Sequence, residues 1–115
     1  MSKDIPLKQK EAIRESANVL KELLQNNLIK IVLYGSYARG DYNNLSDIDI
    51  FVLVKNNKNE LNSLLNKICD KFYELDLKYN VTLNPLIESS QVYDKYKDYS
   101  LLFENIEKDG VVLYG

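Results

Sequence analysis

Residues 30–54 read KIVLYGSYARGDYNNLSDIDIFVLV, and this stretch decides the fold. The apolar run from Ile31 to Tyr34 stops at Gly35, which is typical of a buried strand that enters a tight turn. A second apolar run follows the polar loop and predicts a neighbouring strand. Glycine lets the backbone approach a ligand closely, and the first amides of a short helix at residues 36–39 would point at an anion such as a triphosphate. We therefore expect a phosphate-binding turn between two strands.

Two carboxylates stand at the start of the second strand. Side chains two residues apart on a strand share a face, so Asp47 and Asp49 should project together. Like charges that close repel each other unless a cation lies between them, and Mg²⁺ suits such a pair because it takes carboxylate oxygens together with substrate phosphates. The Ser36 hydroxyl is placed either to cap the short helix or to donate to a phosphate oxygen. These residue types predict phosphoryl chemistry, specifically transfer of a nucleotide.

The arrangement of Gly35-Ser36, a ten-residue spacer and Asp47-Ile48-Asp49 resembles the signature of the DNA polymerase β-like nucleotidyltransferase superfamily. The sequence of residues 35–52, GSYARGDYNNLSDIDIFV, is most similar to the minimal nucleotidyltransferase group, the antitoxin partners of HEPN-domain toxins. Residues 101–114 also resemble the usual end of such domains. The resemblance implies an α/β (α+β) fold with a small mixed sheet and helices packed mainly on one face. We expect residues 1–115 to form one such domain.

The same resemblance implies roles for particular residues. Asp47 and Asp49 would be the catalytic residues and the ligands of Mg²⁺, while Gly35, Ser36 and Arg39 would bind the nucleotide. The implied reaction is transfer of AMP from ATP to a hydroxyl, in particular a tyrosine of a HEPN-domain toxin, which this transfer would neutralise. The residues alone leave Arg39 open between a phosphate contact and an ion pair with Asp41.

One feature departs from the superfamily pattern, which has a third carboxylate on a later strand. The candidate strand, residues 81–87, contains no acid, and Thr82 and Asn84 occupy its inward positions. Glu88 shares their face but lies about 13 Å beyond Asn84 at ~3.3 Å per residue. Three functions therefore stay open: a slow transferase, a binding module that neutralises its partner by forming a complex, and, with less support, a small-molecule nucleotidyltransferase. Tyr37 and Tyr42 flank the site and are candidates to stack on a nucleotide base.

Helical periodicity predicts two long amphipathic helices, over residues 7–26 and 59–78. Cys69 falls on the apolar stripe of the second helix, so we expect it in the core. Ser89 or Ser90 should cap a short helix, a further helix should cover residues 101–108, and residues 111–114 should form a last short strand. Pro85 marks the third strand as an edge strand or a bulged one.

Composition excludes several other classes of protein. The chain has no histidine and one cysteine, so His-based triads, His-zinc sites and disulfides within the chain are excluded. A net charge of −2, from 15 basic and 17 acidic residues, gives no overall basic field, so we expect no direct nucleic-acid binding. No long apolar run or signal peptide is visible, and we expect a cytoplasmic location without membrane attachment. The domain is too small to include a second lobe that clamps a nucleotide base, and a partner or a second copy could supply that wall.

Overall fold

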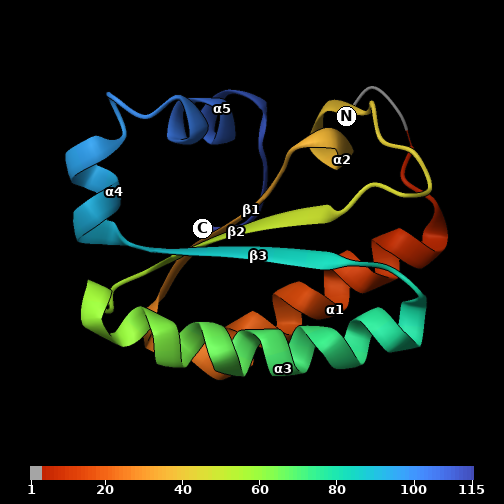
Figure 1. Cartoon of the computed structure of the whole chain (residues 1–115), viewed down its shortest axis with the longest axis horizontal. Helices are drawn as coiled ribbons and strands as arrows, with labels where there is room; N and C mark the ends of the chain where they lie inside the picture. The colour runs from red at the N-terminus through yellow and green to blue at the C-terminus, as the bar shows by residue number, and fades with distance from the viewer. Residues whose placement is uncertain (1–3) are drawn as a thin grey trace.

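The structure, a computed structural model that describes residues 4–115, is built on one four-stranded mixed sheet (Figure 1). The strands run in the order β3-β2-β1-β4. Their bounds are β1 Leu28–Tyr34, β2 Ile48–Val54, β3 Leu83–Ser89 and β4 Val111–Tyr114. β1 is antiparallel to both β2 and β4, whereas β2 and β3 are parallel. This confirms the predicted small mixed sheet and places Pro85 on an edge strand, as expected.

The helices form a layer on each face of the sheet, and the long ones share one face (Figure 1). They are α1 Leu7–Leu24, α2 Ser36–Arg39, α3 Leu61–Tyr79, α4 Ser90–Tyr96 and α5 Leu101–Asp109, with single 3-10 turns at Gln25–Asn27 and Lys58–Glu60. α1 and α3 lie together beneath the sheet, while α4 and α5 cover part of the opposite face. The parallel pair β2 and β3 is joined by α3, because a parallel connection needs a crossover of this kind.

Alternation along β2 divides the core into two parts. Ile48, Ile50, Val52 and Val54 belong to the larger cluster, which packs against α1 and α3. Phe51 and the residues of the same phase belong to a smaller cluster beneath α4 and α5. A strand buried on both faces reads as a continuous apolar run, which explains why this stretch shows little polar alternation after its two aspartates.

The smaller cluster is aromatic and holds α4 and α5 to the sheet. The ring of Phe51 lies 5.6 Å from the ring of Tyr93 and 6.1 Å from the ring of Phe103, measured between centroids. The Tyr93 hydroxyl donates a hydrogen bond to Glu107 Oε1, which links α4 to α5. Ser89 accepts a hydrogen bond from the Val92 amide and caps α4, as the sequence predicted.

Several predictions about these elements differ from the structure. α1 ends at Leu24 rather than at residue 26, and α3 covers Leu61–Tyr79 rather than residues 59–78. The third strand covers residues 83–89 rather than 81–87. Cys69 is exposed on α3 instead of being buried in the core, whereas Ile68 and Phe72 of the same helix are buried. A helix turns by about 100° per residue, so Cys69 points well away from the line that joins its buried neighbours to the sheet.

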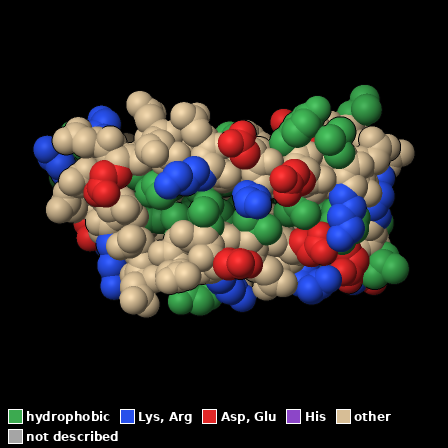
Figure 2. Space-filling view, turned by 90° about the horizontal axis from the view of Figure 1, so that it is seen from below, with side chains coloured by type: hydrophobic (Ala, Val, Ile, Leu, Met, Phe, Trp, Pro, Cys, Tyr) green, Lys and Arg blue, Asp and Glu red, His purple; other side chains and the backbone are tan. Residues whose placement is uncertain are grey.

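The outer face of the long helices is mixed in character. Figure 2 shows a band of hydrophobic side chains along the middle of this face, with basic and acidic side chains on either side. Val19 and Leu23 of α1 are half-buried there, and Lys78 of α3 forms an ion pair with Glu15 of α1 at 3.0 Å. Within residues 4–115, no helix is long and apolar enough to cross a membrane.

Candidate functional site

The predicted phosphate turn begins where β1 ends, at Gly35. Its φ of 74° lies in the region that favours glycine. A Cβ atom built on Gly35 would overlap Oδ2 of Asp49, so the carboxylate occupies the space that any larger residue would need. The Gly35 carbonyl accepts hydrogen bonds from the amides of Ala38 and Arg39, which closes the single turn of α2. The first amides of this turn, at Ser36 and Tyr37, have no acceptor within the helix.

Asp49 lies on the face of β2 that carries Phe51, opposite to α1 and α3. Asp49 is half-buried and Asp47, one residue before the strand, is exposed. Because β1 and β2 are antiparallel, the end of β1 meets the start of β2, and Tyr34 is the register partner of Asp49. The sheet therefore brings Gly35 and Asp49 together, and Asp47 directly precedes the strand that carries Asp49.

The third strand contributes an amide at this position. Asn84 is the register partner of Asp49 in β3, and its Nδ2 atom donates a hydrogen bond of 2.9 Å to Asp49 Oδ1. Thr82 lies beside Asp47, because its carbonyl accepts a hydrogen bond of 2.8 Å from the Ile48 amide. Glu88 is level with Leu53, at the other end of β2. The neutral side chain of Asn84 thus contacts Asp49, and the backbone of Thr82 lies beside the start of β2.

Arg39 takes one of the two roles that the sequence left open. Its Nε atom lies 3.2 Å from Asp41 Oδ2, and both side chains are about half or more exposed, at 48% and 62%. Exposed pairs of this kind contribute little to stability, so a stronger anionic ligand can compete for the guanidinium.

The expectation that Tyr37 stacks on a base was wrong. Tyr37 is only 2% exposed, and its ring stacks on the ring of Tyr42 at 4.4 Å between centroids with an interplanar angle of 7°. The Tyr42 hydroxyl donates to the Asp4 carbonyl, which ties the loop after α2 to the start of the described chain. The two rings support the loop that leads to Asp47 rather than reaching into the site. Ser46 stabilises a turn in the same loop, since its hydroxyl accepts a hydrogen bond from the Asn43 amide.

Electrostatics at the site reflect burial and the charge of the aspartates. Burial, with a smaller contribution from Asp49, raises the pKa of Tyr34 to about 12, so this phenol stays neutral beside the carboxylate. Burial is also the main cause that raises the pKa of Asp76 on α3, and the charge of Asp47 adds to it. Asp76 Oδ1 accepts a hydrogen bond of 2.8 Å from the Leu83 amide and so anchors the start of β3.

Sequence reasoning assigned no site role to Tyr34 or Asp76. The signal for Tyr34 is its position directly before Gly35 on a strand, which puts it in the row of Asp49. The role of Asp76 depends on a contact seven residues along the chain, between a helix and the following strand.

The two carboxylates of the site fit one divalent cation that substrate phosphates would also coordinate. Asp47 and Asp49 offer hard oxygen atoms, and Mg²⁺ is ordinarily bound by one or two carboxylates together with substrate phosphates and water. Within residues 4–115, no three acidic or thiol side chains are grouped so that they alone would hold a metal ion. A polar pocket of about 270 Å³ lies beside the loop that leads to Asp47 and is lined in part by Ser46 and Thr82.

Comparison with known proteins places this arrangement in a family. The nucleotidyltransferase domain family matches residues 13–112. "Putative protein adenylyltransferase MJ0604" of Methanocaldococcus jannaschii is 35% identical over 108 residues, which cover 94% of this chain and 100% of that protein. A second protein of the same organism, "Putative protein adenylyltransferase MJ0141", is 33% identical over 90 residues, which cover 76% of this chain and 87% of that protein.

A solved structure shares the fold. The crystal structure of a nucleotidyltransferase, described as putative, from Sulfolobus solfataricus superposes with a TM-score of 0.52 at 24% identity, covering 99% of this chain and 92% of that one. At this identity the likeness concerns the fold alone. The family match and the relatives show that the chain belongs to the nucleotidyltransferase domain family. Both relatives named above carry the name of protein adenylyltransferases.

Proposed function

We propose that this protein transfers AMP from ATP, in a Mg²⁺-dependent reaction, to a hydroxyl group of a partner protein. The observation that carries the proposal is the meeting of Gly35 with Asp49 at the ends of adjacent strands, with Asp47 one residue before the strand that carries Asp49. A backbone turn for phosphate and a carboxylate pair for a cation lie there side by side. The family membership and the names of the relatives support the adenylyl group as the one transferred.

In the proposed reaction, the acceptor oxygen attacks the α-phosphorus of ATP, the bond to the β-phosphate oxygen breaks, and pyrophosphate leaves. A bound Mg²⁺ ion would neutralise phosphate charge and align the leaving group. Gly35 and the amides after it would hold the phosphates, and Asp47 and Asp49 would fix the cation. Within residues 4–115, no third acidic side chain joins Asp49 in a metal-binding group, and the amide of Asn84 contacts Asp49 instead. The proton of the acceptor therefore passes to solvent or to a phosphate oxygen, which predicts slow turnover, since loss of a general base costs about 10²–10⁴ in rate.

We further propose that the acceptor is a tyrosine of a HEPN-domain toxin, that the modification neutralises this toxin, and that the pair acts in the cytoplasm. This step is supported by the resemblance of residues 35–52 to minimal nucleotidyltransferase antitoxins. The nearly neutral net charge agrees with a protein acceptor better than with a polynucleotide.

The test is the intact mass of the protein and of a candidate HEPN partner after incubation with ATP and Mg²⁺. We expect added AMP units on the partner with the native chain and none with Asp47→Asn or Asp49→Asn, or when the cation is chelated. Asp70→Asn is the matched control, because this exposed residue of α3 loses the same charge away from the site. Unchanged transfer by both site variants would refute the proposal.

A second candidate is a binding module that neutralises its partner without chemistry. The hydrogen bond from Asn84 to Asp49 favours it, because it puts a neutral amide where a third acid would complete the site. In this case the partner would gain no mass, and neutralisation would survive the loss of both aspartates. Transfer of AMP to the partner by the native chain would exclude this binding module.

A further inference from the structure

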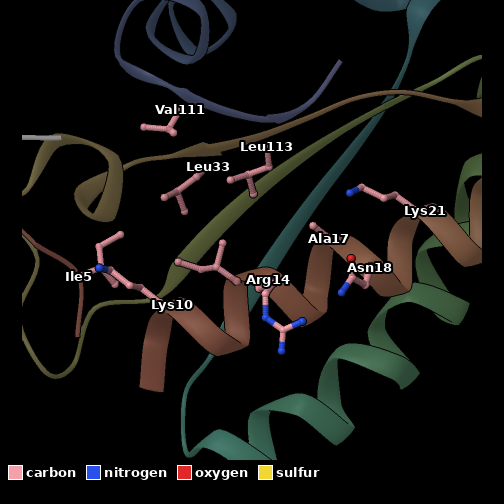
Figure 3. Close-up of a pocket in the computed structure, with 10 residues that line it drawn as sticks. Ile5, Lys10, Arg14, Ala17, Asn18, Lys21, Leu33, Val111 and Leu113 are labelled. Carbon is pink, nitrogen blue, oxygen red and sulfur yellow. The ribbon is translucent and has the colours of Figure 1, made fainter. Parts of the chain in front are cut away.

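A groove lies on the other side of the sheet from Asp49, between α1 and the edge formed by β1 and β4 (Figure 3). Its volume is about 310 Å³. The floor is apolar and consists of Ile5, Ile13, Ala17, Leu33, Val111 and Leu113. Leu33 and Asp49 lie on opposite faces, since Leu33 belongs to the core cluster under α1. The groove is therefore separate from the nucleotidyltransferase site.

One flank of the groove is basic. Lys10, Arg14 and Lys21 line it from α1, and Figure 3 shows their side chains projecting from this helix. At about 100° per residue, these three side chains fall within about 40° of one another around the helix. Arg14 forms an ion pair with Glu11 at 2.6 Å, and the ammonium of Lys21 lies 5.6 Å from the centre of the Tyr114 ring.

The acidic side chains of α1 lie on another side of the helix. Glu11, Glu15 and Glu22 fall about 60–140° further round than the basic residues, towards α3. Glu15 forms its ion pair with Lys78 of α3, which confirms that this side faces α3. Among the described residues that line the groove, three are basic and none is acidic. An occupant of the groove meets positive charge first.

The opposite flank is the edge of the sheet. Within the described residues, β4 pairs only with β1, so one side of its backbone carries no strand. Val111 and Leu113 are half-buried and face the groove, while Val112 and Tyr114 are exposed. A sheet edge of this kind can accept a further strand, with main-chain hydrogen bonds along the edge and alternate side chains in a pocket.

We propose that the groove binds an extended segment of a partner protein in which apolar side chains alternate with carboxylates. The apolar side chains fill the floor between α1 and β4, the carboxylates face Lys10, Arg14 and Lys21, and the backbone pairs with β4. Charge complementarity selects an acidic segment over a basic one, and the apolar floor selects it over a fully polar one. The proposal does not depend on nucleotide transfer, because the groove and Asp49 lie on opposite faces.

The experiment uses three labelled octapeptides and the native chain. We expect an octapeptide of alternating valine and glutamate to bind, measured by fluorescence anisotropy. It should shift the backbone amide NMR signals of residues 111–114 and of the α1 flank. Octapeptides of alternating valine and lysine, or serine and glutamate, should bind at least about tenfold more weakly. Equal binding of all three, or signal shifts confined to other surfaces, would overturn the proposal.

A pair of charge variants tests the basic flank. Lys10→Glu combined with Lys21→Glu should weaken binding of the valine–glutamate peptide by about tenfold or more. Lys67→Glu combined with Lys97→Glu gives the same change of net charge at exposed positions outside the groove, and should leave binding nearly unchanged. Equal weakening by both pairs would show that only net charge matters and would overturn the proposal. A native chain that forms dimers in sedimentation experiments, with the groove signals altered by dilution, would identify a second copy as the occupant and also overturn it.

Discussion

Replacing Asn84 by aspartate should make the stability of the protein depend on divalent cations. The Asn84 amide donates to Asp49 Oδ1 at 2.9 Å, so Asn84→Asp exchanges an attractive contact for two carboxylates at close range. Two unit charges 4 Å apart interact by about 1 kcal/mol in water and about 4 kcal/mol at an effective dielectric constant of 20. Because Asn84 is exposed, we expect the lower part of this range, about 1–2 kcal/mol of destabilisation without a cation.

The assay is thermal unfolding followed by circular dichroism, with and without Mg²⁺ or Mn²⁺. For a domain of this size, 1 kcal/mol shifts Tm by about 4–8 °C, so the variant should lose about 4–16 °C in a chelator. Added cation should recover that loss, because a third carboxylate binds the cation more tightly in the folded state than in the unfolded one. If the proposed transfer occurs, the variant should also transfer AMP faster than the native chain.

Asn84→Ala is the control, because it removes the hydrogen bond without adding a charge. It should destabilise the protein by about 0.5–1.5 kcal/mol, to the same extent in chelator and in cation. A Tm of Asn84→Asp that is equal to that of the native chain in chelator, or that does not respond to cation, would refute the placement of Asn84 against the carboxylate pair.

Three further changes test other contacts. Gly35→Ala should cost about 1–3 kcal/mol in urea unfolding and abolish transfer, because φ is 74° and the new methyl group would displace Asp49; native stability would contradict this. The pKa of Tyr34 is raised from 10 to about 12, so its contribution to stability is complete below pH 10 and is lost as the pH rises towards 12; Tyr34→Phe should therefore unfold at higher alkaline pH than the native chain, and an equal midpoint would argue against a buried phenol. Tyr93→Phe removes the hydrogen bond to Glu107 and should lower the free energy of unfolding by about 0.5–1.5 kcal/mol. Compared with the native chain, amide exchange should become faster in α4 and α5 than it does in α3.

The parts of the site that the sequence could predict are those built by nearby residues. Gly35 and the pair Asp47 and Asp49 are close in sequence, and the two strands that carry them are antiparallel neighbours. Strand alternation and the turn preference of glycine are local rules, so they were sufficient to predict which side chains share a face. The start of α1, the serine cap of α4 and the bounds of β4 followed from caps and periodicity in the same way, whereas α1 ends at Leu24 rather than at residue 26.

The rest depends on contacts that local rules do not contain. The hydrogen bond from Asn84 to Asp49 joins residues 35 positions apart, and the register of β3 decides it. The polar sequence around Tyr37 predicts an exposed aromatic side chain in a loop, yet in the fold this ring stacks on Tyr42 and is buried. Cys69 fits a 3,4-spaced stripe, but the sheet covers only part of the width of that stripe.

The crossover through α3 has an evolutionary consequence. It brings Asn84 to the site on an edge strand, while the glycine turn and both aspartates come from one continuous segment. Codons for asparagine and aspartate differ at a single base, so one substitution interconverts a neutral and an acidic neighbour of Asp49 without touching the segment that carries the motif. Lineages with this fold can therefore change the charge of the site by the shortest mutational step and return by the same one.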